Sequence, residues 1–456
     1  MPIPSINPYN GEILTEFREH TAADINEILE LSHKASVDWK EASFLSRGRL
    51  MKNCAGLLRS RSADLGKVIT LEMGKRIAES EAEVNKCAWV CDYYADHAEK
   101  FLREEKLEAG EAESYLAYEP LGTVLAVMPW NFPFWQVFRF AAPALMAGNA
   151  GLLKHASNVP QCAIAIENIF LEAGFPRGLF QSVLLSAGRV GPVIDDPRVK
   201  AITLTGSEEA GRKVAGRAGQ NIKKVVLELG GSDPFIVLND AAVEEAAETA
   251  ARARMINCGQ SCIAAKRFIL HEKISETFIG LFTRHLGLLE PGDPLVPSTG
   301  YGPLARPDLA DQLEQQVGES IHQGAHLALG GKRPEGFSRA FYMPTLLTRV
   351  KPGMPAFDEE IFGPVAAVTV VETEEEAIAL ANHSRFGLGA SLWTSDMSRA
   401  KALASKIESG AVFINEMVAS HPAVPFGGIK SSGYGRELSW PGIREFMNLK
   451  SVWIKK

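Results

Sequence analysis

The chain has 456 residues, too many for one ordinary hydrophobic core, so two or three domains are expected. A hydrophobic content of 46% and a charged content of 23% are typical of a soluble globular protein, and the net charge of −7 argues against a nucleic-acid partner. The N-terminus lacks the features of a signal peptide, no apolar run of about 18 residues could cross a membrane, and the 6 cysteines are scattered, which together favour a cytoplasmic protein.

The first hundred residues are predicted to be mostly helical. Thr21 is placed to cap a helix, because the apolar residues that follow it share one helical face. Further helices are expected over about residues 47–60 and 79–102.

From residue 122 onward, short apolar segments alternate with helical ones. Strands are expected at residues 122–128, 150–154, 182–185, 201–205 and 224–229, with helices between them. This alternation predicts a parallel sheet covered by helices on both faces, and such sheets bind ligands at the carboxyl ends of their strands.

A second α/β pattern begins near residue 231 and continues to about residue 426. Its first elements are expected to be strands at 234–238 and 266–271, a helix at 241–256 and another from 275. Residues 112–118 and 448–456 look like strands without helices of their own, and the apolar tail could add to the sheet edge of another subunit.

Three short runs carry the residues best suited to catalysis. Cys262 lies in GQSCIAAKR at 259–267, and Glu228 lies in VLELGG at 226–231. A thiol nucleophile and an isolated carboxylate base suit covalent catalysis on a carbonyl, and the amide of Asn131, in PWNFP, can hold an oxyanion. From the residues alone, a buried structural cysteine, a carboxylate at a helix cap and a helix N-cap at Asn131 remain alternatives.

All three runs resemble signature segments of the NAD(P)-dependent aldehyde dehydrogenase superfamily. The runs FDEEIFGP at 357–364, PFGGIK at 425–430 and SGYGRE at 432–437 extend the resemblance over essentially the whole chain. It implies that Cys262 attacks an aldehyde, that the Asn131 amide and the backbone N–H of Cys262 stabilise the oxyanion, and that Glu228 activates water to hydrolyse a thioester.

A cofactor turn is expected at TGSEEAG, residues 205–211, where a strand leads into a helix N-terminus that can cradle a phosphate. Its spacing is not G-x-G-x-x-G, and an ordinary strand-to-helix junction is the alternative. The resemblance places Glu360 on the nicotinamide ribose and Phe362 near the nicotinamide ring. The other cofactor-binding residues that it implies around this ring and the phosphates are Pro129, Trp130, Gly206, Ser207, Gly211 and Leu229.

Lys154 and Ser157 bear on the choice between NAD and NADP. The resemblance places Lys154 on the adenosine ribose, and NAD-preferring members usually carry a glutamate at the position of Ser157. A carboxylate about 4 Å from a 2′-phosphate would cost roughly 1 to 4 kcal/mol, depending on screening. Serine removes this repulsion, so NADP is expected to be preferred, with NAD as a second cofactor. A helix cap is the alternative role for Ser157, and His155 replaces the proline usual in the family.

Arg139 lies about two helical turns after Asn131. Family members that oxidise succinate semialdehyde carry an arginine here for the distal carboxylate, so the resemblance implies that substrate. Ile256 replaces a second arginine of some of these enzymes, and Ser420 could supply another donor. A surface or subunit-contact arginine, a glutarate- or malonate-type semialdehyde, a broad aldehyde range and a non-catalytic binding protein remain alternatives.

The resemblance predicts a Rossmann-type cofactor domain plus an α/β catalytic domain and a small β oligomerisation element. The cofactor domain is expected at residues 1–108 and 122–230, the catalytic domain at 231–439, and the oligomerisation element at 109–121 and 440–456. A homodimer or dimer of dimers is expected. Ala264 stands where some members have a second cysteine as a redox switch, and a Cys258–Cys262 disulfide is expected only if the geometry permits. No metal is expected, because no acidic residue lies between His322 and His326.

Overall fold

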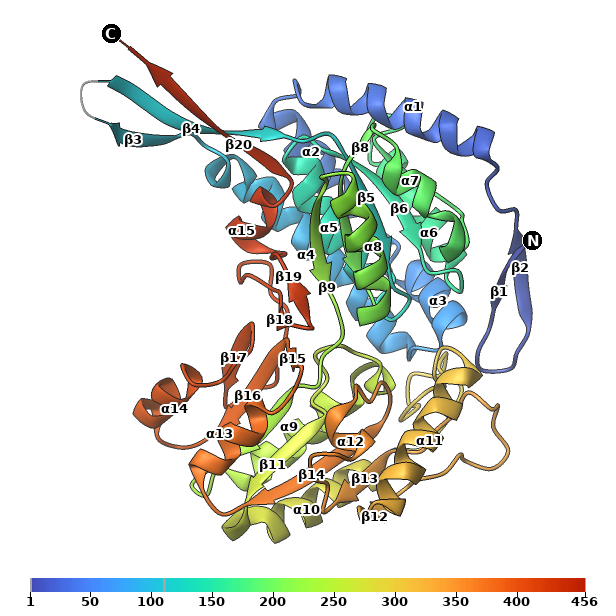
Figure 1. Cartoon of the computed structure of the whole chain (residues 1–456). Helices are drawn as coiled ribbons and strands as arrows, with labels where there is room; N and C mark the ends of the chain where they lie inside the picture. Colours follow the sequence, from blue (N-terminus) through green and yellow to red (C-terminus); the bar gives the residue numbers. More distant parts are fainter. Residues whose placement is uncertain (1, 110–111, 456) are drawn as a thin grey trace.

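Two twisted sheets, each flanked by helices, dominate the fold, and a narrow three-stranded sheet extends from one of them (Figure 1). The computed structural model describes residues 2–109 and 112–455. Within these residues no helix is long and apolar enough to cross a membrane. The two main sheets confirm the predicted α/β fold with parallel strands.

The first sheet has the strand order β19-β9-β8-β5-β6-β7, and all of its neighbouring pairs are parallel except β19 with β9. Its central strands are buried along nearly their whole length, as expected for a parallel sheet covered on both faces. The strands are β5 (Thr123–Met128), β6 (Ala150–His155), β7 (Phe180–Ser182), β8 (Val199–Thr205), β9 (Lys224–Glu228) and β19 (Gly433–Tyr434).

Helices cover both faces of this sheet (Figure 1). Thr21 caps the first of them in a capping box, because its side chain accepts from the Asp24 N–H while the Asp24 carboxylate accepts from the Thr21 N–H. The helices are α1 (Ala22–Trp39), α2 (Phe44–Ser60), α3 (Ser62–Met73), α4 (Ile77–Phe101), α5 (Trp135–Met146), α6 (Pro160–Glu172), α7 (Gly191–Asp195) and α8 (Glu208–Gln220), with the short 3₁₀ helix η1 (Ala187–Arg189).

The second sheet has the order β12-β13-β14-β11-β10-β16-β17 and is parallel except for the pair β12 and β13. Its strands are β10 (Pro234–Val237), β11 (Arg267–His271), β12 (His326–Leu329), β13 (Thr345–Thr348), β14 (Val365–Val371), β16 (Gly389–Trp393) and β17 (Ala411–Ile414). The helices around it are α9 (Val243–Met255), η2 (Ile256–Gly259), α10 (Glu272–Gly287), α11 (Pro307–His322), α12 (Pro355–Asp358), α13 (Glu374–Asn382) and α14 (Met397–Ala404).

The C-terminal strand β20 (Met447–Ile454) pairs with β4 (Ala112–Pro120) of the same chain, and β4 also pairs with β3 (Glu105–Ala109). In the described part of the chain β20 is an edge of this sheet, which projects away from the rest of the molecule (Figure 1). The short helix α15 (Ser439–Arg444) precedes it. The addition of β20 to another subunit's sheet and the domain boundaries remain predictions. Residues 110 and 111 of the predicted oligomerisation element lie outside the described residues.

Several elements differ from the sequence-based predictions. The third predicted strand lies at Phe180–Ser182 rather than at 182–185, because Val183 and Leu185 leave the sheet and join the buried cluster around Leu29 of α1. The first hundred residues also contain α3 and a hairpin of β1 (Ile3–Ile6) and β2 (Ile13–Phe17), none of which was predicted from the sequence. Another antiparallel pair joins β15 (Phe386–Gly387) to β18 (Ile429–Lys430).

Candidate active site

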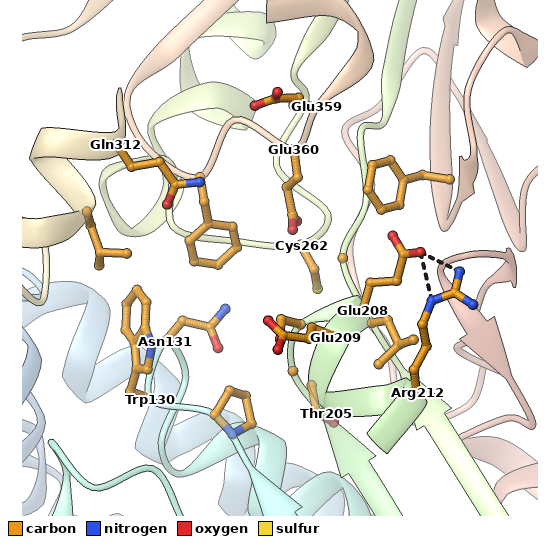
Figure 2. Close-up of a pocket in the computed structure, with 18 of the residues that line it drawn as sticks. Trp130, Asn131, Thr205, Glu208, Glu209, Arg212, Cys262, Gln312, Glu359 and Glu360 are labelled. Carbon is orange, nitrogen blue, oxygen red and sulfur yellow. Dashed lines mark hydrogen bonds and ion pairs between the residues drawn. The ribbon is translucent and has the colours of Figure 1, made fainter. Parts of the chain in front are cut away.

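A cleft of about 700 Å³ lies between the two sheet layers, at the carboxyl edge of the first sheet (Figure 2). This is the edge at which parallel sheets bind ligands, and here β9 continues directly into the segment that leads to β10. The predicted site residues that line the cleft are Pro129, Trp130, Asn131, Gly206, Ser207, Leu229, Cys262, Glu360 and Phe362.

Cys262 lies in a tightly held loop between η2 and β11. The buried Lys266 ammonium donates to the carbonyl oxygens of Ser261, Cys262 and Ala264 at 3.0, 2.8 and 3.3 Å. A Cβ at Gly259 would lie 2.1 Å from the Gly363 carbonyl oxygen, so only glycine fits there. These contacts fix the backbone that carries the thiol.

The surroundings of Cys262 favour the neutral thiol. Burial raises the pKa of Cys262 to about 12, while the charges of Arg139 and Lys266 act in the opposite direction. The thiolate is the nucleophilic form, so a proton must leave the thiol before or during attack. All six cysteines are free thiols, and Cys258 is buried.

Asn131 comes from the opposite wall of the cleft to Cys262 (Figure 2). Its Nδ2 donates to the Gln260 carbonyl oxygen at 3.1 Å, and its own carbonyl accepts from Asn257 Nδ2 at 2.7 Å. The amide carries a second N–H, which remains for an oxyanion. The helix-cap alternative for Asn131 is wrong, because α5 begins after Phe134.

The start of α5 is held instead by Glu83 of α4. One carboxylate oxygen of Glu83 accepts from the backbone N–H groups of Phe134 and Trp135 at 2.8 and 2.9 Å, and the other pairs with the buried Lys75. A carboxylate at a helix N-terminus also interacts favourably with the helix dipole. The PWNFP turn is therefore fixed from the α4 side.

Glu228 ends β9 and is 2% exposed, and neither of its carboxylate oxygens accepts a hydrogen bond in the described part of the chain. Burial and the nearby Glu437 raise its pKa well above the usual range, against the charge of Arg139. The helix-cap alternative is wrong, because the residue ends a strand. Among the described residues Glu228 does not line the cleft, nor does it line a second, smaller cavity that also reaches Cys262. Its carboxylate lies against Gly427.

Glu360 and Phe362 both line the cleft. The Glu360 carboxylate accepts from the Gly231 N–H at 3.0 Å and lies 3.8 Å from the Lys266 ammonium, and Figure 2 shows it above Cys262. Phe362 packs edge-on against Trp130, with ring centroids 5.7 Å apart. The cleft therefore offers a carboxylate and an aromatic surface beside the thiol.

Three predicted cofactor residues, Lys154, Ser157 and Gly211, do not line this cleft. The Lys154 ammonium is buried at the carboxyl end of β6, and no hydrogen bond or ion pair holds it within residues 2–109 and 112–455. Ser157 is exposed and does not cap α6, whose N-cap is Val159, so the helix-cap alternative is wrong. A Cβ at Gly211 would lie 2.7 Å from Leu229, so this glycine permits close packing of α8 on β9.

A second cavity, of about 260 Å³, meets the cleft at Cys262 and Gln136, which line both. Arg139 and Ser420, the predicted substrate residues, line this cavity together with Ile256. Arg139 is 1% exposed and forms an ion pair with Glu437, so the surface or subunit-contact alternative is wrong.

Lys86 of α4 also lines this cavity, and its ammonium donates to the Ser420 hydroxyl at 2.8 Å. Lys86 and Gln136 lie in no run that marks them in the sequence, and Glu437 ends the run at 432–437, where nothing indicates that it pairs with Arg139. No group of three metal-ligating side chains occurs within the described residues.

Comparisons with known protein families, sequences and structures match this chain over nearly its whole length. The family model described as aldehyde dehydrogenase family matches residues 1–452. A probable succinate-semialdehyde dehydrogenase of Synechocystis sp., named for NADP(+), is 51% identical over 454 residues, and one of Mycobacterium tuberculosis is 47% identical over 459, each match covering 100% of both chains. A solved succinic semialdehyde dehydrogenase from Streptococcus pyogenes, in complex with NADP+, has 38% identity and a TM-score of 0.97 and also covers 100% of both chains. The chain therefore belongs to the aldehyde dehydrogenase family.

Proposed function

We propose that the protein oxidises succinate semialdehyde to succinate with NADP as the preferred cofactor, the substrate and cofactor in the names of the relatives above. The observation that carries the proposal is the position of Cys262, which lines both the cleft and the smaller cavity. A nucleophile at this junction can reach an aldehyde held in the cavity while a hydride acceptor occupies the cleft.

The reaction begins when the Cys262 thiol gives up its proton to water in the cleft and the sulfur adds to the aldehyde carbon. The oxygen of the adduct gains a negative charge and accepts hydrogen bonds from the Asn131 amide and the Cys262 backbone N–H. A nicotinamide dinucleotide held in the cleft by residues such as Glu360 and Phe362 would supply the hydride acceptor for oxidation of this adduct to a thioester, which Cys262 carries. Glu228 then takes a proton from the water that attacks the thioester, which releases the carboxylate and the thiol.

Glu228 must turn toward the cleft for this last step, because its carboxylate lies against Gly427. Neither carboxylate oxygen accepts a hydrogen bond within the described residues, so rotation of the side chain breaks none. Leu229 and Gly230, which follow it directly, already line the cleft. The base thus needs only a change of rotamer at a fixed strand end.

The cleft and its surroundings fit a phosphorylated dinucleotide. Lys154 supplies a buried ammonium with no partner in the described part of the chain, which an anionic or hydroxyl oxygen would satisfy. The N-terminus of α8, capped by Ser207, opens beside Gly206, where the nearest atom to an added Cβ is 3.7 Å away. Glu360 can accept from ribose hydroxyls. NAD, which lacks the 2′-phosphate, fits the same groups.

Ser157→Glu should reverse the cofactor preference. A carboxylate near the 2′-phosphate of NADP would lower kcat/KM for NADP by about 5- to 1000-fold, from roughly 1 to 4 kcal/mol of repulsion, and affect NAD much less. Initial rates with both cofactors at saturating aldehyde measure this. Ser157→Ala is the matched control, since it removes the hydroxyl without adding charge. An unchanged cofactor ratio in Ser157→Glu would show that the 2′-phosphate binds elsewhere.

The substrate proposal predicts a preference for a carboxylate-bearing aldehyde. With NADP, kcat/KM for succinate semialdehyde should exceed that for butanal by at least about tenfold, because a charge-assisted hydrogen bond contributes about 1.5 to 3 kcal/mol. A panel that adds malonate and glutarate semialdehydes sets the preferred chain length. Equal values for succinate semialdehyde and butanal would instead indicate a generalist aldehyde dehydrogenase.

We also infer a homodimer or a dimer of dimers. The edge strand β20 exposes large apolar side chains, with Leu449 at 54% and Trp453 at 66% exposure, and strands of this kind pair readily with another chain. Cytoplasmic localisation remains a prediction that rests on the scattered cysteines.

A further inference from the structure

We propose that Lys266 is a positioning residue of the reaction, whose single buried ammonium stabilises the Cys262 thiolate and also keeps the Glu360 carboxylate charged. Lys266 lies four residues after the nucleophile and lines neither the cleft nor the smaller cavity among the described residues, so it acts through these two groups. The inference rests on the proposed function, since Cys262 is its nucleophile and Glu360 its ribose-binding carboxylate.

The backbone of Lys266 is fixed to the second sheet, directly before β11. Its N–H donates to the Asp233 carbonyl oxygen at 3.1 Å, and its own carbonyl accepts from the Ala367 N–H at 3.1 Å. The side chain is 0% exposed and ends between the Cys262 loop and Glu360. The ammonium is therefore held from both ends, by the sheet and by the loop.

The hydrogen bonds of Lys266 require its charged form. It donates to three carbonyl oxygens, those of Ser261, Cys262 and Ala264, and a neutral amine has only two N–H groups. Burial lowers the pKa of Lys266, and the nearby Glu360 carboxylate is the largest effect that raises it. All three N–H groups serve neutral carbonyls, so the charge acts on Glu360, 3.8 Å away, through space.

The charge of Lys266 also acts on the thiol. Burial raises the pKa of Cys262 to about 12, Arg139 and Lys266 oppose this effect, and Glu360 and Asp233 add to it. Lys266 donates to the carbonyl of Cys262 itself, so its charge is tied to the residue that carries the thiol. Without Lys266 the thiolate would face two carboxylates with one cation fewer.

Glu360 depends on the same ammonium. It is half-buried at the wall of the cleft, and burial raises its pKa. Lys266 is the largest effect in the opposite direction, followed by the Gly231 N–H and the charges of Arg254 and Arg385. A charged carboxylate accepts stronger hydrogen bonds from ribose hydroxyls than a neutral carboxyl does. Lys266 therefore supports the nucleophile and the cofactor contact together.

Lys266→Met tests the effect on the thiol, because methionine keeps the length of the side chain and removes its charge. The enzyme without added cofactor is treated with iodoacetamide over a range of pH, and mass spectrometry follows the Cys262 peptide, the other five cysteines being buried. The alkylation rate should fall about 3- to 30-fold at each pH, because less thiolate is present. A loosened loop would instead expose the thiol, so an unchanged or faster rate overturns this role.

Two further variants separate charge from structure. Glu360→Gln removes a negative charge near the thiol, so alkylation should become faster, and Lys266→Arg, which keeps the positive charge, should restore most of the rate lost in Lys266→Met. Lys273→Met, at an exposed site on α10, is the matched control and should match the wild type. Rates that change in the same direction in Lys266→Met and Glu360→Gln would indicate altered access and overturn the electrostatic role.

Titration with NADP, followed by tryptophan fluorescence, tests the effect on Glu360, since Trp130 lines the cleft. Lys266→Met should raise the Kd about 2- to 30-fold, because a neutral carboxyl accepts weaker hydrogen bonds. Adding Lys266→Met to Glu360→Gln should raise it little further, since both act on the same contact. An unchanged Kd in Lys266→Met overturns this role.

The wild type is measured first, so that failure of the proposed function can be recognised. Activity that survives complete alkylation of Cys262, or a wild type that binds no NADP, contradicts the proposed function. Alkylation that abolishes activity in the wild type, together with wild-type alkylation rates and Kd in Lys266→Met, contradicts only the role of Lys266.

Discussion

Cys262→Ala should lower kcat with NADP and succinate semialdehyde by at least about 10⁴-fold, because no other group can form the covalent adduct. The loss should affect every aldehyde equally, since the thiol acts on the carbonyl that all of them share. Spectrophotometric assays of NADPH formation measure the activity, and mass spectrometry of the wild type quenched during turnover should show an acyl group on the peptide that contains Cys262.

Cys258→Ala is the matched control for this experiment. Cys258 is a buried cysteine of η2, just before the loop that carries Cys262, and alanine can keep its backbone conformation about as well as cysteine does. Its kcat should stay close to that of the wild type, and thermal unfolding of both variants should show that they remain folded. NADP-dependent oxidation that survives in Cys262→Ala would contradict the covalent mechanism.

Glu228→Gln should separate the two halves of the reaction. Removing a general base lowers the rate of the step that it assists by about 10²- to 10⁴-fold, so steady-state turnover should fall by this factor. Hydride transfer precedes that step, so a rapid burst of about one NADPH per active site should remain in stopped-flow experiments. Loss of the burst as well would show that Glu228 acts before the thioester forms.

The pH dependence follows from the raised pKa of Glu228. Only the carboxylate form can take a proton from water, and burial together with Glu437 favours the protonated form. Steady-state kcat of the wild type should therefore rise with pH above the ordinary titration range of a glutamate, as Glu228 loses its proton. In Glu228→Gln this rise should disappear from kcat, whereas the wild-type burst amplitude should stay constant over the same range.

The sequence predicted those parts of the fold that depend on local pattern. The cap at Thr21 and the alternation of short apolar strands with helices beyond Gly122 follow from side-chain periodicity, which a single segment carries within itself. The predicted position of β7 was wrong because Val183 and Leu185 are as apolar as strand residues, although they are buried outside the strand, in the cluster that includes Leu29 of α1. Only long-range packing distinguishes these two kinds of burial.

The candidate site likewise has parts that local sequence patterns predict and parts that only long-range packing determines. The sequence by itself singled out Cys262, Asn131 and Glu228, because each lies in a short run whose residue order marks it. The tertiary structure decided that Asn131 and Ser157 cap no helix and that Arg139 is paired with Glu437. Lys86 is more than 300 residues from Ser420 in the chain, and only the packing of α4 against that loop brings them together at the wall of one cavity. Contacts of this kind arise from the burial of whole elements, so no local pattern can predict them.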